Sequence, residues 1–236
     1  MNKNTTNDEL LAAFQQSLRP CAYLSADLLQ FGVKSIVEDE LLKEIPFIKS
    51  VATLFKFGKN IHDRNLLNQT LTFIVSLNDG SISDEQLKMY QDSLAQNPQK
   101  LEKELGRIML LLNRHIEYEQ SKVLAKFEQA YIAKKITWEK LCELAIANER
   151  MFASDYEILQ NIYKSSAGVT FKDYEYSYQI DRLVSLGLIS KDTLFEAADV
   201  AERLRWDGLV NSTQTRDASV TIFGKLFCDL LEERAN

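Results

Sequence analysis

Glycine and proline, the residues that most often interrupt a helix, are scarce in this chain: it has eight glycines and three prolines in 236 residues. In a helix interior, proline costs about 3 kcal/mol and glycine about 1 kcal/mol relative to alanine. A chain with few of either can form long helices. Hydrophobic residues make up 45% of the sequence, which is enough to bury a core. We therefore expect a folded, mostly helical protein.

Cysteines and long apolar runs are also sparse. The three cysteines, Cys21, Cys142 and Cys228, are far apart and odd in number, so they are not expected to form a disulfide framework. No run of 18 apolar residues occurs, and the first ten residues, MNKNTTNDEL, are polar. These features predict neither a membrane span nor a signal peptide. The expected location is the cytoplasm, where thiols stay reduced.

Positive charge is in deficit. The chain has 28 lysines and arginines against 34 aspartates and glutamates, which gives a formal net charge of −6. From Ser154 to the last residue, nine basic residues stand against 14 acidic ones. Neutralisation of phosphates supplies most of the non-specific affinity of proteins for nucleic acids. The charge balance therefore argues against a protein that coats DNA or RNA.

Sequence signatures of enzymes and metal sites are missing as well. The two histidines, His62 and His115, do not stand in a metal-ligand spacing such as H-E-x-x-H. The sequence has no P-loop, no nucleophile elbow and no Rossmann glycine pattern. We expect His115 on a solvated helix face with nearby glutamates and Lys122. The sequence thus predicts a protein that is not an enzyme and that binds no metal and no cofactor.

Helix start signals follow one another along the chain. They are capping boxes at Ser83 with Gln86 and at Ser154 with Glu157, an Asn97–Pro98 pair, and Thr137. Beyond residue 152 the segments become shorter, and strand patterns alternate with helix patterns. We therefore predict a mostly α fold, with an N-terminal helical bundle over residues 1–152 and a small α+β lobe over residues 153–236.

Two stretches of the lobe, RLVSLGLI (residues 182–189) and SVTIFGKLF (residues 219–227), suggest how it is built. Leu183 and Leu186 are expected to face the core, and Gly187 allows the chain to turn into a strand. A second strand carries Val220 and Ile222, and the residues Thr221 to Gly224 open the last helix.

This order resembles the winged helix-turn-helix superfamily over residues 154–233, about a third of the chain. The sequence departs from the family pattern at residues 193–206, where a helical segment stands in place of a tight wing. The alternative is a generic α+β lobe that caps the helical bundle.

The winged-helix resemblance does not by itself decide the partner of the lobe. Tyr174, Tyr176 and Tyr178 suit a protein interface, where aromatic residues serve as anchors. Duplex DNA is the alternative partner. The residues expected to read DNA in that case are Gln179, Arg182 and Arg216. The acidic balance of this region favours the protein interface.

A basic amphipathic segment, PFIKSVATLFKFGKNI, lies earlier in the chain. Its apolar side is made of Phe47, Val51, Leu54 and Phe55. Such a side is most often part of a core, and the alternative is a membrane surface or the groove of a partner.

The N-terminal half is similar to segments of uncharacterised helical proteins of bacterial prophages and defence islands. The similarity spans residues 36–163 and rests on short patterns such as IPFIKSV and HDRNLL. It implies a role in bacterial conflict. We therefore expect a non-enzymatic interaction or regulatory component that forms a homo-oligomer or a partner complex. A sequence-specific DNA-binding regulator is the second expectation, and a membrane-perturbing effector is the third.

Overall fold

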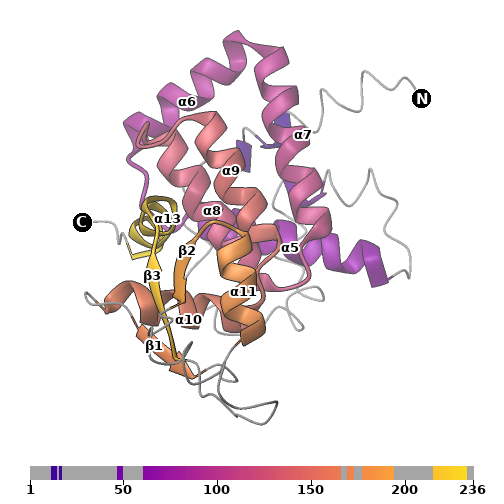
Figure 1. The fold of residues 1–236 in the computed structure, drawn as a ribbon. Coiled ribbons are helices and arrows are strands. Elements are labelled where there is room, and N and C mark those ends of the chain that lie inside the picture. Colours follow the sequence, from indigo (N-terminus) through magenta and orange to yellow (C-terminus); the bar gives the residue numbers. More distant parts are fainter. Residues whose placement is uncertain are drawn as a thin grey trace, which may run out of the picture. The chain divides into compact units, whose positions relative to one another are not determined.

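The computed structural model describes residues 12–14, 16–17, 47–49, 61–165, 169–172, 177–193 and 215–232. Most of these residues are helical, and a small antiparallel sheet lies near the C-terminus (Figure 1). The predicted fold class, mostly α with a small α+β lobe, is confirmed. The chain divides into two compact units. Unit 1 is Met1–Arg150 with Glu233–Asn236, and unit 2 is Met151–Glu232.

Helix α8 is the central helix of unit 1. From residue 61 onward, the helices of this unit are α5 (Ile61–Leu77), α6 (Asp84–Gln96), α7 (Pro98–Arg114), α8 (Tyr118–Ile132) and α9 (Trp138–Glu149). Helix α8 packs against α5, α6 and α9, and its side chains Leu124 and Phe127 are completely buried. Burial on several sides explains why α8 includes few charged residues on its inner positions.

Three of the four predicted helix starts are confirmed. Ser83 and Gln86 form the capping box of α6, Asn97 accepts the N–H of Lys100 at α7, and Thr137 accepts the N–H of Lys140 at α9. These signals act between residues three positions apart, so the local sequence is sufficient to identify them.

The segment from Phe47 begins in the core. Phe47 is fully buried, its ring contacts that of Phe14 edge-on at 5.1 Å between centroids, and its N–H donates to Ser17. These contacts favour the core interpretation of the amphipathic segment. Val51, Leu54 and Phe55 lie outside the described residues. Among the helices of the described ranges, none combines the length and apolar character needed to cross a bilayer.

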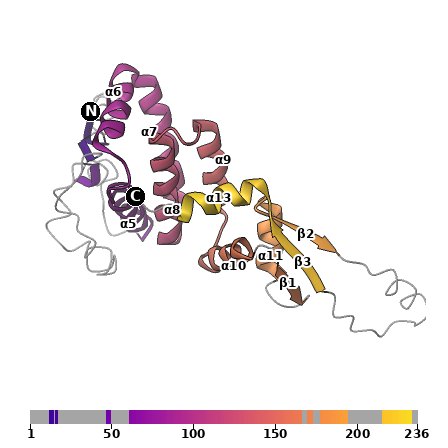
Figure 2. The ribbon, with the colours of Figure 1, turned by 90° about the vertical axis from the view of Figure 1, so that its left-hand side faces the viewer.

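Unit 2 combines three helices and three strands in its described part. They are α10 (Ala153–Lys164), β1 (Val169–Lys172), α11 (Ser177–Ser185), β2 (Ile189–Thr193), β3 (Thr215–Val220) and α13 (Ile222–Glu232). Strand β3 lies between β1 and β2 and is antiparallel to both (Figure 2). The register places Ile189 opposite Val220. Residues 194–214, which include most of the expected extra helix, lie outside the described part.

Two local predictions in unit 2 are wrong. Helix α10 starts at Ala153 rather than after Ser154, because the carboxylate of Asp155 accepts the N–H of Phe152 at 2.7 Å and caps the helix there. Ile222 belongs to α13 rather than to a strand, and its side chain is 92% exposed. The hydroxyl of Thr221 accepts the N–H of Gly224, so α13 begins directly after Thr221.

The turn after α11 is hydrogen-bonded to, and closely packed against, the start of α13. Gly187 adopts a left-handed conformation with φ of +72°, and its N–H and that of Leu188 donate back into the last turn of α11, as in a Schellman motif. The Leu188 carbonyl then accepts the N–H of Thr221 at 3.1 Å. A Cβ atom on Gly224 would lie 1.8 Å from that same carbonyl oxygen. Only glycine fits at this contact.

Gly224→Ala is therefore expected to lower the free energy of unfolding of unit 2 by about 3 kcal/mol, because α13 or the turn must move to relieve the clash. Gly106→Ala is the matched control. Gly106 is exposed inside α7 with open space around its Cβ position, so alanine there should stabilise the helix by about 1 kcal/mol. Urea denaturation measures both values. A Gly224→Ala protein as stable as the parent would contradict this close packing.

Candidate functional site

Helix α11 presents one side to the core of unit 2 and the other side to solvent. Ile180 and Leu183 are buried, whereas Tyr178 is 84% exposed. Tyr178 and Arg182 are four residues apart, so they are neighbours on the outer side of the helix. Gln179 is half-buried. The outer side of α11 thus carries three of the residues that the sequence analysis selected.

Three other residues of this region were selected from the sequence: Tyr174, Tyr176 and Arg216. Tyr174 and Tyr176 lie outside the described residues. Arg216 lies on β3, where its backbone is opposite Phe171 of β1 and Thr193 of β2. The roles of these residues in binding protein or DNA stay predictions.

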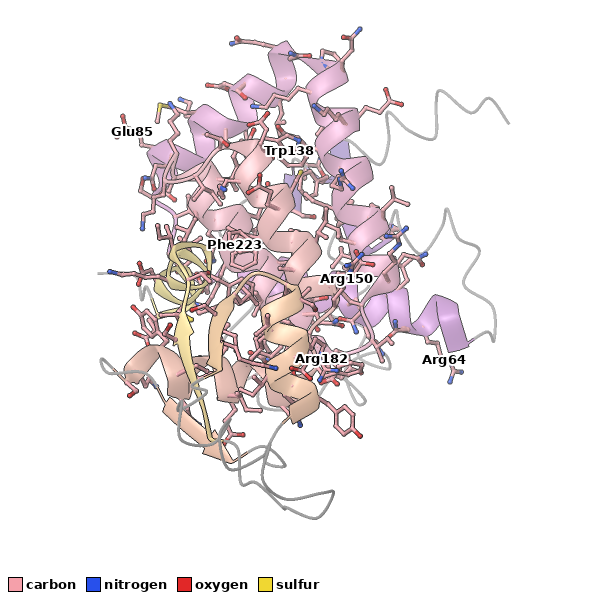
Figure 3. The ribbon with its side chains drawn as sticks, in the orientation of Figure 1. Arg64, Glu85, Trp138, Arg150, Arg182 and Phe223 are labelled. Carbon is pink, nitrogen blue, oxygen red and sulfur yellow. The ribbon has the colours of Figure 1, made fainter. Side chains whose placement is uncertain are left out.

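Arg182 forms a bidentate ion pair with a buried carboxylate in the described part of unit 2. Its Nε and Nη2 atoms donate to the two carboxylate oxygens of Asp155 at 2.7 and 2.8 Å, and Asp155 is completely buried. Charge-assisted bonds in this bidentate geometry are among the strongest hydrogen bonds in proteins. The bonds with Asp155 raise the pKa of the Arg182 guanidinium above its usual value. Figure 3 shows Arg182 on α11.

Phe152 completes a small surface around this ion pair. Its ring lies 4.6 Å from the guanidinium carbon of Arg182, a cation–π distance, and half of the Phe152 residue is exposed. We call Phe152, Tyr178 and Arg182 the aromatic face of unit 2. Aromatic residues and arginine are enriched where proteins bind other proteins. The buried Asp155 holds the middle of this face in one conformation.

Arg182→Met is expected to lower the free energy of unfolding by about 3 kcal/mol, because it leaves the Asp155 carboxylate buried without its cation. The double variant Asp155→Asn with Arg182→Met should recover part of this loss, since the buried charge is then gone and the amide oxygen can still cap α10. Denaturant unfolding of the parent, of each single variant and of the double variant gives the coupling energy between Asp155 and Arg182. A coupling near zero would show that the pair is unimportant for folding.

A cluster of titratable groups is buried in unit 1, between α6, α7 and α8. The hydroxyl of Tyr90 is 2.9 Å from Glu104 Oε2 and 3.0 Å from Glu128 Oε1. The hydroxyl of Tyr131 donates to Glu104 Oε1 at 2.6 Å. The ammonium of Lys100 lies 3.8 Å from the same oxygen. Two carboxylates therefore share one tyrosine hydroxyl within a helical core.

Burial controls the acidity of this cluster. Glu128 is completely buried, and this burial, together with the nearby Glu104 carboxylate, raises the pKa of Glu128 to about 8. Burial is the main cause that raises the pKa of the Tyr90 hydroxyl, and the nearby glutamates raise it further. The pKa of Tyr131 is raised for the same reasons. Tyr131 also contacts the ring of Trp138 at 5.5 Å between centroids; Figure 3 labels Trp138 at the start of α9.

His115 is buried, which corrects the expectation of a solvated face. It lies between α7 and α8, where its Nδ1 is 2.9 Å from the Ser121 hydroxyl. Ser121 in turn donates to Gln69 Oε1 at 2.6 Å, and the Gln69 amide nitrogen points to Asn65. The Ser121 proton is thus used on Gln69, so Nδ1 of His115 must carry the proton of the neutral ring. Only Glu119 and Lys122 form the expected exposed pair.

The interior suppresses the charge of this histidine. Burial lowers the pKa of His115 to about 4, and its Nε2 atom has no hydrogen-bond partner among the described residues. Because Ser121 is also fully buried, the pair does not offer a nucleophile to solvent. Its role is to join α5 to the junction of α7 and α8.

His115 should make the protein sensitive to acid. Its folded pKa of about 4 lies below the ordinary 6.5, so its contribution to stability is complete above pH 6.5 and is lost as the pH falls toward 4. The free energy of unfolding of the parent, relative to His115→Asn, should fall by about 1.4 kcal/mol per pH unit over this range. Urea unfolding of both proteins at matched pH values measures the difference. A constant difference would contradict a buried neutral histidine.

Within the described ranges, no three histidine, cysteine, aspartate or glutamate side chains gather in a way that could hold a metal ion. Comparisons of the chain with protein-family models, with curated proteins and with solved structures find no match. Neither the cluster around Glu128 nor the Asp155–Arg182 pair was predicted from the sequence. For the cluster, the available signal was the presence of glutamates, Glu104 and Glu128, at helix positions that otherwise carry apolar residues.

Proposed function

We propose that this protein is a non-enzymatic interaction component, an adaptor or regulator, that binds another protein through the aromatic face of unit 2. The observation that carries the proposal is the exposure of Tyr178 next to a Phe152–Arg182 stack that a buried carboxylate holds in place. Side chains that are already ordered lose less entropy on binding, so they can serve as anchors.

Binding of duplex DNA through the same helix has less support. The guanidinium of Arg182 already makes two hydrogen bonds to Asp155, so its charge is compensated within the protein. The ammonium of Lys191, another cation near this helix, forms an ion pair with Asp181 of α11 at 2.6 Å, so its charge is also compensated. The region from Ser154 onward also carries more acidic than basic residues. A surface with these charges repels phosphates more than it attracts them.

The setting that we propose is the bacterial cytoplasm, in antiphage defence or prophage biology. It rests on the resemblance that short patterns within residues 36–163, such as IPFIKSV and HDRNLL, suggest to helical proteins of prophages and defence islands. The identity of the neighbouring genes tests the setting, because regulators, adaptors and effectors have different neighbours.

Tyr178→Ala should weaken binding of the protein partner, or self-association, by about tenfold or more, since exposed aromatic anchors carry much of the energy of an interface. Sedimentation of the purified protein measures self-association first. A photo-crosslinking residue at position 178, used in the native host, then identifies a partner, and the affinity of that purified partner is measured for parent and variant.

Ser185→Ala is the matched control, because Ser185 is also exposed on α11 but carries no aromatic ring. It should leave binding unchanged. A strictly monomeric protein without a crosslinked partner would contradict the proposal. Binding of DNA fragments that weakens with salt and is reduced by Gln179→Ala and Arg216→Ala would favour the DNA-binding alternative instead. Arg182→Ala is unsuitable for this test because it also leaves the buried Asp155 carboxylate without its cation.

A further inference from the structure

The two hydrogen bonds around Tyr90 need two protons, but a neutral tyrosine with two ionised glutamates supplies only one. A phenol has a single proton, and an ionised carboxylate can only accept. Tyr90 nevertheless lies within hydrogen-bond distance of oxygens from two carboxylates, Glu104 Oε2 and Glu128 Oε1. If both glutamates were ionised, one of these two contacts would join two oxygens without a proton between them. One of the glutamates must therefore be protonated.

The surroundings decide which glutamate carries that proton. Glu104 accepts a hydrogen bond from Tyr131 and has the ammonium of Lys100 nearby, so its negative charge is stabilised. Glu128 has no cation within ion-pair distance in the described part of the chain, and its Oε2 atom has no hydrogen-bond partner there. An ionised carboxylate in such a place is strongly disfavoured, because it loses its hydration and gains no cation. The proton consequently belongs to Glu128.

We infer that protonated Glu128 of α8 donates to Tyr90 of α6, that Tyr90 donates to Glu104 of α7, and that loss of this proton releases α6 from the bundle. Helix α6 depends on this link because it buries only Leu87, Tyr90 and Leu94, and it lies at the edge of unit 1 in both views (Figures 1 and 2). Ionised Glu128 would leave Tyr90 with two acceptors and one proton. Two negative charges would also face each other away from water.

The groups around Glu128 come from each helix that packs near it. They are Tyr90 from α6, Lys100 and Glu104 from α7, Tyr131 from α8, and Glu139 from α9, which acts on Tyr131. Helix α5 packs on α8 as well, but residues 65–77 include no titratable side chain. Among the described residues, the two central carboxylates therefore have one nearby cation, Lys100.

The direction of the pH effect follows from these contacts. The folded pKa of Glu128, about 8, lies above the ordinary 4.5, so the folded protein holds a proton that an opened protein releases. Opening should thus become more favourable by about tenfold per pH unit between these values, and the increase should end above pH 8. His115 acts in the opposite direction, but only below pH 6.5. From pH 6.5 to 8, we therefore expect the proton of Glu128 to dominate the pH dependence of opening among the described groups.

Hydrogen exchange of the α6 amides tests the inference. The parent and Glu128→Gln are compared at each pH, so that the intrinsic exchange rates cancel. The glutamine is uncharged and can still donate to Tyr90. The opening constant of the parent should rise relative to that of the variant by about tenfold per pH unit from pH 6.5 to 8. Glu119→Gln, an exposed change on the same helix, should keep the slope of the parent.

Equal slopes in the parent and Glu128→Gln would overturn the inference, and so would a pH effect as strong in the α9 amides as in those of α6. A second measurement does not depend on the variant. The infrared carbonyl stretch of a protonated carboxylic acid should be present in the parent at pH 6.5 and should disappear as the pH rises above 8. Absence of this band at pH 6.5 would overturn the assignment of the proton.

Discussion

An amide or carboxylate that is buried between helices destabilises a protein unless it finds a hydrogen-bond partner, and this requirement fixes how the helices of this chain end and meet. In unit 1, the amide of Gln129 donates to the carbonyl of Ser76 and to Asp79, where α5 ends. Gln120 donates to the carbonyl of Glu149 at the end of α9, and Asn148 donates back to the carbonyl of Gln120. The apolar core supplies most of the stability, whereas these few side chains determine the helix positions.

The two units meet the same requirement with different electrostatics. In unit 2, the buried Asp155 has a cation of its own, so the pair holds Arg182 in a fixed orientation at the surface. In unit 1, two acids meet around Tyr90, and one cation lies near them. The first arrangement favours a rigid surface, which a binding protein can use. The second gives a helix whose attachment responds to the concentration of protons.

The distance in sequence between interacting residues explains what could be predicted. The caps of α6, α7 and α9 join residues three positions apart, and the sequence was sufficient to find them. Tyr90 contacts Glu104 and Glu128, which are 14 and 38 residues away, and no local pattern brings them together. His115 looked solvated because glutamates follow it, yet its partner Ser121 lies on the next helix. Pairings of this kind depend on the packing of whole helices.

The contact between Gly224 and Leu188 also has a consequence for the connection between β2 and β3. Strands β2 and β3 pair from Ile189 opposite Val220 to Thr193 opposite Arg216, and the turn of α11 is bonded to the start of α13 at the other end of the pair. The 21 residues between Thr193 and Thr215 therefore leave and re-enter the sheet at adjacent points. The pairing of Thr193 with Arg216 therefore holds the two ends of this connection side by side, so the strands carry the closure of the connection at that edge of the sheet.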